Sequence, residues 1–169
     1  MWRDSLRPQP IAPKPGQESV WDYPRPPRVE DSTKHIRVIC GGITIADTRR
    51  ARRVLETSQA PVYYVPAADV QMQYLQAEGK RTFCEWKGLA AYYTVVVGAH
   101  VAREAAWSYP DPSPGYELIR DYIGFYPGRM DACYVDEEQA RPMPGDFYAG
   151  WITDDILGPF KGAPGTEGW

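Results

Sequence analysis

The chain has 169 residues, of which 43% are hydrophobic and 13% aromatic, so it is long enough for one domain with a proper core and too apolar for a disordered acidic chain. Its 22 acidic and 19 basic residues give a formal net charge of −3, which excludes a global basic field for nucleic acid or for a membrane surface. No apolar run approaches the roughly 20 residues of a membrane span, and the N-terminus lacks the apolar core of a signal peptide, so the cytoplasm is the expected location.

Residues 1–30 are rich in proline and show no hydrophobic periodicity. Proline fixes φ and removes a backbone donor, so this segment is expected to form an extended arm outside any sheet interior. Trp21 and Tyr23 are costly to leave in water, which predicts that the second half of the arm docks on this subunit or on a partner. A homodimer formed through the arm is therefore one expectation.

Residues 31–153 predict a single β-rich domain built from hairpins. Strand-like runs at 35–40 and 43–47 flank Gly41-Gly42, the strongest hairpin signal, because glycine supplies the positive φ of tight turns. Further hairpins are predicted for residues 53–57 with 62–65, for 92–97 with 100–103, and for 124–126 with 131–135; a short helix is the alternative for residues 49–57.

One short helix is predicted from Pro114 to about Asp121, with Ser113 as its N-cap and Glu117 in its first turn. Residues 154–169 return to a composition of glycine, proline and acid, and are expected to form a loose tail. Short strands at hairpin spacing with one short helix predict a mainly β fold, either a small antiparallel β-barrel or a strongly curled sheet.

The cysteines and histidines predict neither a disulfide framework nor a metal site. Cys40, Cys84 and Cys133 are odd in number, and none belongs to a Cys-x-x-Cys pair. His35 and His100 each lie within a strand-like run, which argues against a histidine-rich metal site, while carboxylate-only sites stay open. We therefore expect no metal and no cofactor.

Two segments carry the candidate chemistry. Lys87 lies between Trp86 and a glycine, where it can hold a carboxylate or phosphate, or close a loop by an ion pair with Glu104 or Asp111. Trp107, Tyr109 and Asp111 alternate along an extended segment, so period two puts them on one side as an aromatic wall, with core packing of Trp107 as the alternative.

A catalytic role is the weaker interpretation of these residues. Cys84 would need its pKa lowered by a cation or an imidazole, and in an extended strand Lys87 faces the other side unless a turn intervenes. The alternative is a buried structural thiol. Glu104 and Asp131 are candidate acid/base residues, for which structural ion pairing is the alternative.

Several segments together resemble the bacterial and fungal family called domain of unknown function 427. They include the motifs Cys-x-Trp-Lys-Gly, Ala-Trp-Ser-Tyr-Pro-Asp-Pro and Phe-Tyr-Pro, and the resemblance covers roughly residues 15–153. It implies a small, mainly antiparallel β domain with a short helix and a pocket, without an established activity. Relatives tend to have histidine where this chain has Phe83, so a Cys-His mechanism based on Cys84 is not expected.

An older label calls this family nucleotidyltransferase-like, and the residues do not support that label. The chain has no Gly-rich phosphate loop, since the Gly41-Gly42 turn is not followed by Lys-Ser/Thr and a helix. It also has no clear pair of carboxylates on a strand for a metal.

The sequence thus predicts a domain that binds a small anionic or aromatic organic ligand in a pocket formed by Trp86, Lys87, Tyr93, Trp107 and Tyr109. The first alternative is an enzyme that uses the same pocket, with Lys87, Glu104 or Cys84 in acid/base or covalent catalysis. The second is a structural or oligomeric protein whose arm embraces a second subunit.

Overall fold

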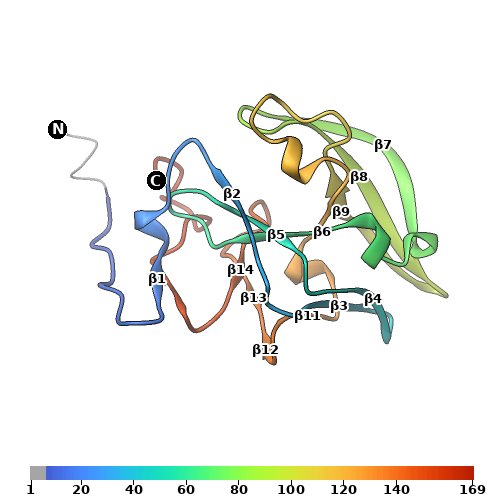
Figure 1. Ribbon diagram of the computed structural model, residues 1–169, viewed down its shortest axis with the longest axis horizontal. Coiled ribbons are helices and arrows are strands. Elements are labelled where there is room, and N and C mark those ends of the chain that lie inside the picture. The colour runs from blue at the N-terminus through green and yellow to red at the C-terminus, as the bar shows by residue number, and fades with distance from the viewer. Residues whose placement is uncertain (1–6) are drawn as a thin grey trace.

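The computed structural model describes residues 7–169, and these residues form mainly β-strands (Figure 1). The helical parts are 3-10 helices of three residues each: η2 (Val20–Asp22), η3 (Ala67–Asp69), η4 (Met72–Tyr74), η5 (Glu117–Ile119) and η6 (Pro127–Arg129). The prediction of a mainly β fold is confirmed. Within the described residues, no helix has the length and apolarity to cross a membrane.

The larger sheet has seven strands in the order β2-β5-β6-β10-β9-β8-β7, and all neighbours are antiparallel. Its strands are β2 (Arg28–Asp31), β5 (Arg52–Leu55), β6 (Val62–Val65), β7 (Leu75–Cys84), β8 (Gly88–Val97), β9 (His100–Ser108) and β10 (Ile123–Phe125). The long strands β7, β8 and β9 lie together at the upper right of Figure 1.

This sheet is open, because β2 and β7 stand at its two ends and do not pair with each other. The β-barrel alternative is therefore wrong, since a barrel requires its first and last strands to pair. The free edge of β7 carries Glu78, Lys80 and Arg81 and a β-bulge between Ala77 and Arg81, features that protect edge strands from further pairing.

The second sheet has four strands in the order β12-β11-β3-β4. They are β3 (Ile36–Cys40), β4 (Ile43–Thr48), β11 (Ala132–Val135) and β12 (Glu138–Gln139). Gly41 and Gly42 form the predicted turn, with φ of 59° and 76°. The predicted hairpin of residues 124–126 with 131–135 is wrong, because η6 leads the chain from β10 in the larger sheet to β11 in this one.

The helix predicted from Pro114 to Asp121 is reduced to η5. This helix follows Tyr116 and has no side-chain cap, so Ser113 is not an N-cap. Gly115 and Asp121 have φ of 96° and 60°. These positive angles interrupt a right-handed helix on both sides of η5 and explain why it spans only one turn.

The described part of the arm contacts the C-terminal segment of the same chain. β1 (Glu18–Ser19) pairs in parallel with β15 (Ile156–Leu157). The Trp21 indole N–H donates to the carbonyl of Pro159 at 2.9 Å, and its ring lies 5.6 Å from that of Trp169, centroid to centroid. Residues 1–6 of the predicted arm lie outside the described residues, and the domain boundaries at residues 30 and 153 stay a prediction.

A further two-stranded sheet joins β13 (Arg141–Pro142) to β14 (Trp151–Ile152). Trp151 is fully buried, and its indole N–H donates to the carbonyl of Phe125 in β10. This contact ties the C-terminal third of the chain to the larger sheet.

The buried side chains form three clusters. Strand β6 is buried on both faces, so its adjacent tyrosines belong to different clusters: Tyr63 to the first and Tyr64 to the second. The third cluster joins the arm to the C-terminal segment and includes Val20, Tyr23 and Ile156. Three of the four aromatic residues expected to line the pocket, Trp86, Trp107 and Tyr109, belong to the second cluster or pack against it.

Candidate functional site

Lys87 lies in the turn between β7 and β8. Cys84 pairs with Gly88 across the hairpin, and residues 85–87 form the turn itself. The backbone N–H of Lys87 points to the Cys84 Sγ at 3.4 Å. The turn thus brings Cys84 and Lys87 together, although an extended strand would have separated them.

The turn is held from outside by the segment that follows the aromatic wall. The backbone N–H of Ser113 donates to the Lys87 carbonyl at 2.9 Å, and Gly88 bridges to Pro112. A Cβ at Gly88 would come within 3.0 Å of the Ser113 nitrogen, and Gly88 has a φ of 107°. Glycine at this position therefore permits the close approach that fixes the Lys87 backbone.

Trp107 and Tyr109 are both buried in the second cluster, as the core-packing alternative for Trp107 predicted, whereas Asp111 is exposed. The Trp107 and Tyr64 rings meet edge to face at 5.9 Å, and the Trp107 indole N–H donates to the Tyr64 hydroxyl at 3.3 Å. The Tyr109 ring lies 6.4 Å from that of Tyr64. The Lys87 Nζ lies over the Tyr109 ring, 5.8 Å from its centroid, close enough for a cation–π interaction.

The surroundings of Lys87 favour a charged amine beside neutral phenols. Burial opposes the charge, but the coulombic effect of Tyr64 and Cys84 in their ionised forms, together with that of Glu56, outweighs burial and raises the pKa of Lys87 above its ordinary 10.5. Burial also raises the pKa of Tyr64 and of Tyr109. The site therefore presents an ammonium group next to protonated phenols that can donate hydrogen bonds.

The Lys87 amine makes no ion pair with any carboxylate in the described part of the chain. The two partners considered from the sequence are placed otherwise. Glu104 pairs with Lys80 at 2.8 Å, and Asp111 is exposed. Lys87 thus keeps a half-buried charge whose counter-ion is not supplied by those residues.

The structure brings some of the predicted site residues together and not others. Trp86 and Cys84 are half-buried and pack against the second cluster beside Trp107 and Tyr109. Tyr93 packs against the first cluster, with its hydroxyl 3.4 Å from the Ser108 hydroxyl. Neighbouring side chains along a strand point to opposite faces, so Tyr92, and not Tyr93, packs against the second cluster, where Trp107 and Tyr109 lie.

Two tyrosines of this site were not singled out from the sequence. Tyr64 is fully buried, and Tyr116, just before η5, donates its hydroxyl hydrogen to the Pro27 carbonyl at 2.8 Å. The continuous apolar run Val62-Tyr63-Tyr64-Val65 signals a strand buried on both faces, so one of its tyrosines had to face each cluster. No comparable signal marks Tyr116.

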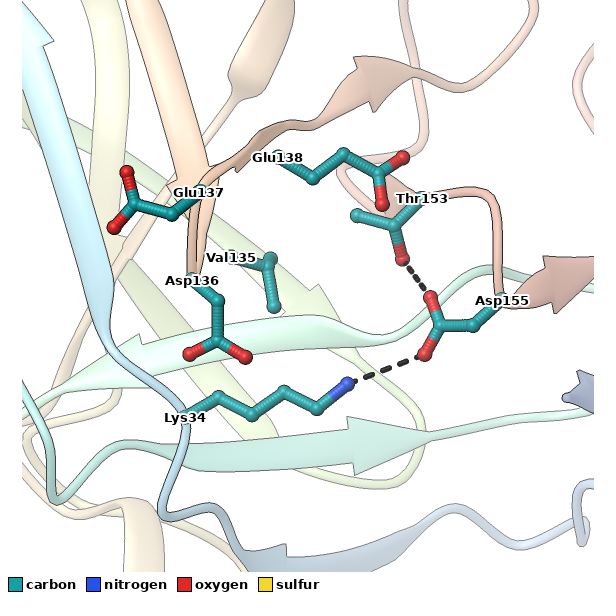
Figure 2. Close-up of a pocket in the computed structure, with 7 residues that line it drawn as sticks. All are labelled: Lys34, Val135, Asp136, Glu137, Glu138, Thr153 and Asp155. Carbon is teal, nitrogen blue, oxygen red and sulfur yellow. Dashed lines mark hydrogen bonds and ion pairs between the residues drawn. The ribbon is translucent and has the colours of Figure 1, made fainter. Parts of the chain in front are cut away.

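Two cavities lie away from Lys87, and both are rich in carboxylates. They measure about 340 Å³ and 270 Å³ and share Lys34 and Asp155 in their linings. Figure 2 shows the first, where the Lys34 amine lies 3.1 Å from an Asp155 oxygen and acidic side chains gather around the pair. Its other lining residues are Val135, Asp136, Glu137, Glu138 and Thr153. This excess of negative charge disfavours an anion there.

Comparison with known families gives one match. The sequence profile of the family described as a domain of unknown function (DUF427) matches residues 28–136. This range begins with β2, ends just after β11, and contains Lys87 with its aromatic neighbours. No curated protein matches the chain.

Proposed function

The chain belongs to the DUF427 family, which is described without a defined function, and for this member we propose that a small organic anion carrying an aromatic ring binds beside Lys87. One observation carries the proposal: a half-buried lysine amine lies over the face of Tyr109 and pairs with no carboxylate of residues 7–169. A carboxylate or phosphate group of a ligand would supply the missing counter-ion.

The aromatic residues define the rest of the ligand. Trp86 is half-buried at the turn and can present part of its indole to a bound ring. Burial raises the pKa of Tyr109 and of Tyr64, so both phenols stay protonated and add no negative charge beside an anionic head group. Lys87 would hold the charge, and the aromatic side chains would hold the ring.

Binding is better supported than catalysis. Proton transfer at Lys87 requires an amine whose pKa lies near neutrality, and the pKa of Lys87 is raised. Glu104 is engaged by Lys80, and Phe83 stands where a histidine could have activated Cys84. An enzyme that uses Lys87, Glu104 or Cys84 stays the alternative proposal.

The proposal predicts that Lys87→Met abolishes ligand-induced stabilisation and leaves the fold intact. Methionine keeps the apolar stem and removes a half-buried charge, so the Tm without ligand should stay the same or rise. The measurement is thermal unfolding with benzoate and phenyl phosphate. At about 100 times Kd, each should raise the wild-type Tm by about 5–10 °C.

Control ligands test whether the Tm shift requires both the negative charge and the aromatic ring. A control variant tests whether the shift depends on Lys87 in particular. Benzamide lacks the negative charge and inorganic phosphate lacks the ring, so both should shift the Tm less than phenyl phosphate does. Lys161→Met removes another lysine that lies over a tyrosine, 5.3 Å from the Tyr148 ring centroid, and should keep the full response. An equal response in Lys87→Met and wild type, or no response to either aromatic anion, would refute the proposal.

A further inference from the structure

Three potential metal ligands that are distant in the sequence meet in the fold. Cys40, His100 and Asp131 each offer one ligand atom, and these atoms all lie within 4.8 Å of one another. We propose that they bind a divalent transition metal of the zinc type, with a fourth coordination position left for water or a substrate.

The fold brings the three residues together where its two main sheets meet. Cys40 ends β3 in the four-stranded sheet, and His100 begins β9 in the seven-stranded sheet. A Cβ at Gly41 would lie 2.8 Å from the Val97 Cβ and 3.5 Å from the His100 Cβ, so the β3–β4 turn and the β8–β9 turn are in direct contact. The ligands therefore come from rigid hairpins of two different sheets.

Asp131 is held in place by the β3 hairpin. Its backbone N–H donates to the Ile39 carbonyl at 2.9 Å, and its Oδ2 accepts the Gly42 backbone N–H at 3.0 Å. Its other oxygen, Oδ1, lies 3.8 Å from the His100 Nε2. A hydrogen bond to one oxygen of a ligating carboxylate is the usual way in which a protein orients that ligand.

The donor set selects the class of metal. A thiolate, an imidazole and a carboxylate together suit zinc and its neighbours, whereas calcium and magnesium prefer oxygen ligands alone. Metal–ligand distances of 2.0–2.3 Å in a tetrahedral site separate the ligand atoms by about 3.5 Å. Pairs of ligand atoms that lie up to 4.8 Å apart therefore need to close by up to about 1.3 Å, which the half-exposed side chains of His100 and Asp131 allow.

Two simpler roles explain the cluster less well. An ion pair between His100 and Asp131 gives no role to the thiol, and 3.8 Å is a long separation for such a pair. A nucleophilic cysteine has to reach its substrate directly, whereas Cys40 is fully buried. A metal ion is the partner that makes use of all three groups.

This site is independent of the proposed ligand site. His100 lies next to the Val97 end of β8, and Lys87 precedes the Gly88 end of the same strand. Loss of metal binding would therefore leave the response to benzoate unchanged, and loss of that response would leave metal binding unchanged.

Cobalt(II) provides the probe, because a thiolate ligand gives it a charge-transfer absorption band in the near ultraviolet. Titration of the reduced, metal-free full-length chain should give this band at one equivalent, and zinc should bleach it by displacing the cobalt. His100→Asn and Asp131→Asn change half-exposed side chains and should fold normally. Each should weaken cobalt binding by about tenfold or more. Cys40→Ser should abolish the band.

The controls are a thiol and a histidine outside the cluster. Cys84→Ser removes the half-buried thiol near Lys87, and His35→Asn breaks the other His–Asp pair, which joins His35 to Asp47 at 2.6 Å. Both variants should keep the band and the affinity of the wild type. Absence of the band in the wild type, its survival in His100→Asn at full affinity, or its loss in Cys84→Ser would overturn the proposal.

Discussion

At the scale of single residues, Arg53 and Lys87 are two partly buried cationic side chains that differ in how their charge is balanced. The Arg53 guanidinium pairs with both Glu18, at 2.8 Å, and Glu30, and its side chain is 14% exposed. Lys87 is half-buried and lacks such a partner among the described carboxylates. The described residues thus balance the charge of Arg53 and supply no ion pair to Lys87.

The Arg53 centre predicts a defined acid sensitivity. The hydrogen bond from Arg53, with one from Tyr23, lowers the pKa of Glu18 below its ordinary 4.5. A carboxyl whose pKa is lowered on folding stabilises the fold above its unfolded pKa, and this contribution is lost as the pH falls through the folded pKa. Glu18→Gln should therefore cost about 1 kcal/mol of unfolding free energy near neutral pH, a figure moderated by the 40% exposure of Glu18.

Urea unfolding from neutral pH down to about pH 3 measures this effect. The difference between wild type and Glu18→Gln should shrink below pH 4.5 and vanish when both side chains are uncharged. Glu137→Gln is the control, because that side chain is 93% exposed and lies 3.9 Å from Arg37. A Glu18→Gln difference that does not change with pH would contradict the role of the charge.

The sequence could predict the part of the candidate site that depends on local strand geometry. It could not predict the part that depends on contacts between distant segments. Trp107 and Tyr109 alternate, so their common side followed from strand geometry. Tyr92 and Tyr93 occupy opposite faces of one strand, but nothing in their local sequence says which face meets Lys87. Tyr93, expected as a wall of that pocket, packs against the first cluster, whereas Tyr92 packs against the second. Contacts that join distant segments, such as that of Tyr64 with Trp107, leave no local pattern.

At the scale of elements, β10 shows how a strand makes room for an aromatic side chain. Gly124 pairs with Tyr64 on one side and with Trp107 on the other. A Cβ at Gly124 would lie 2.6 Å from the Trp107 ring. The indole therefore lies across the backbone of the neighbouring strand, and only glycine leaves it space there.

Gly124→Ala should destabilise the protein by about 1–3 kcal/mol, because Trp107 must move or the strand must shift in a filled core. The matched control is Gly79→Ala in β7, where a Cβ meets no atom within 4 Å and φ is not positive. Denaturant unfolding of both variants checks the prediction. Equal stability of the two alanine variants would show that the Trp107 ring is not confined by β10.

The elements that were predicted correctly are those with local signals. The hairpins β3–β4, β5–β6 and β8–β9 combine apolar runs with turn residues, and all three are present. Strand β7 was not predicted, because its sequence is polar and its side chains are largely exposed. Its strand conformation is stabilised by pairing with β8, a contact that composition does not reveal.

At the scale of the whole molecule, the third cluster binds the arm to the C-terminal segment. Tyr23 and Val20 are buried there with Ile156, and the Tyr23 hydroxyl donates to Glu18 at 2.7 Å. These contacts occur within one chain. They support docking of the arm on its own subunit, and the homodimer formed through the arm stays a competing proposal.

Trp21→Ala distinguishes the two proposals. It removes the hydrogen bond to Pro159 and the ring contact with Trp169, and should cost about 2 kcal/mol of unfolding free energy. If the arm docks within the chain, the Tm should not depend on protein concentration for wild type or variant. A Tm that rises with concentration in the wild type and not in Trp21→Ala would instead support the homodimer. Phe147→Ala, at a side chain that is 79% exposed, is the control.

The parallel pairing of β1 with β15 also has a consequence for the order of folding. It joins residues Glu18 and Ile156, so nearly the whole chain forms a closed loop between them. Forming this contact before the intervening strands would cost the entropy of closing a very long loop. The β7–β8 and β8–β9 hairpins need only contacts between residues close in sequence. We therefore expect the seam between the two ends to form after these hairpins, and to open locally while the two large sheets remain folded.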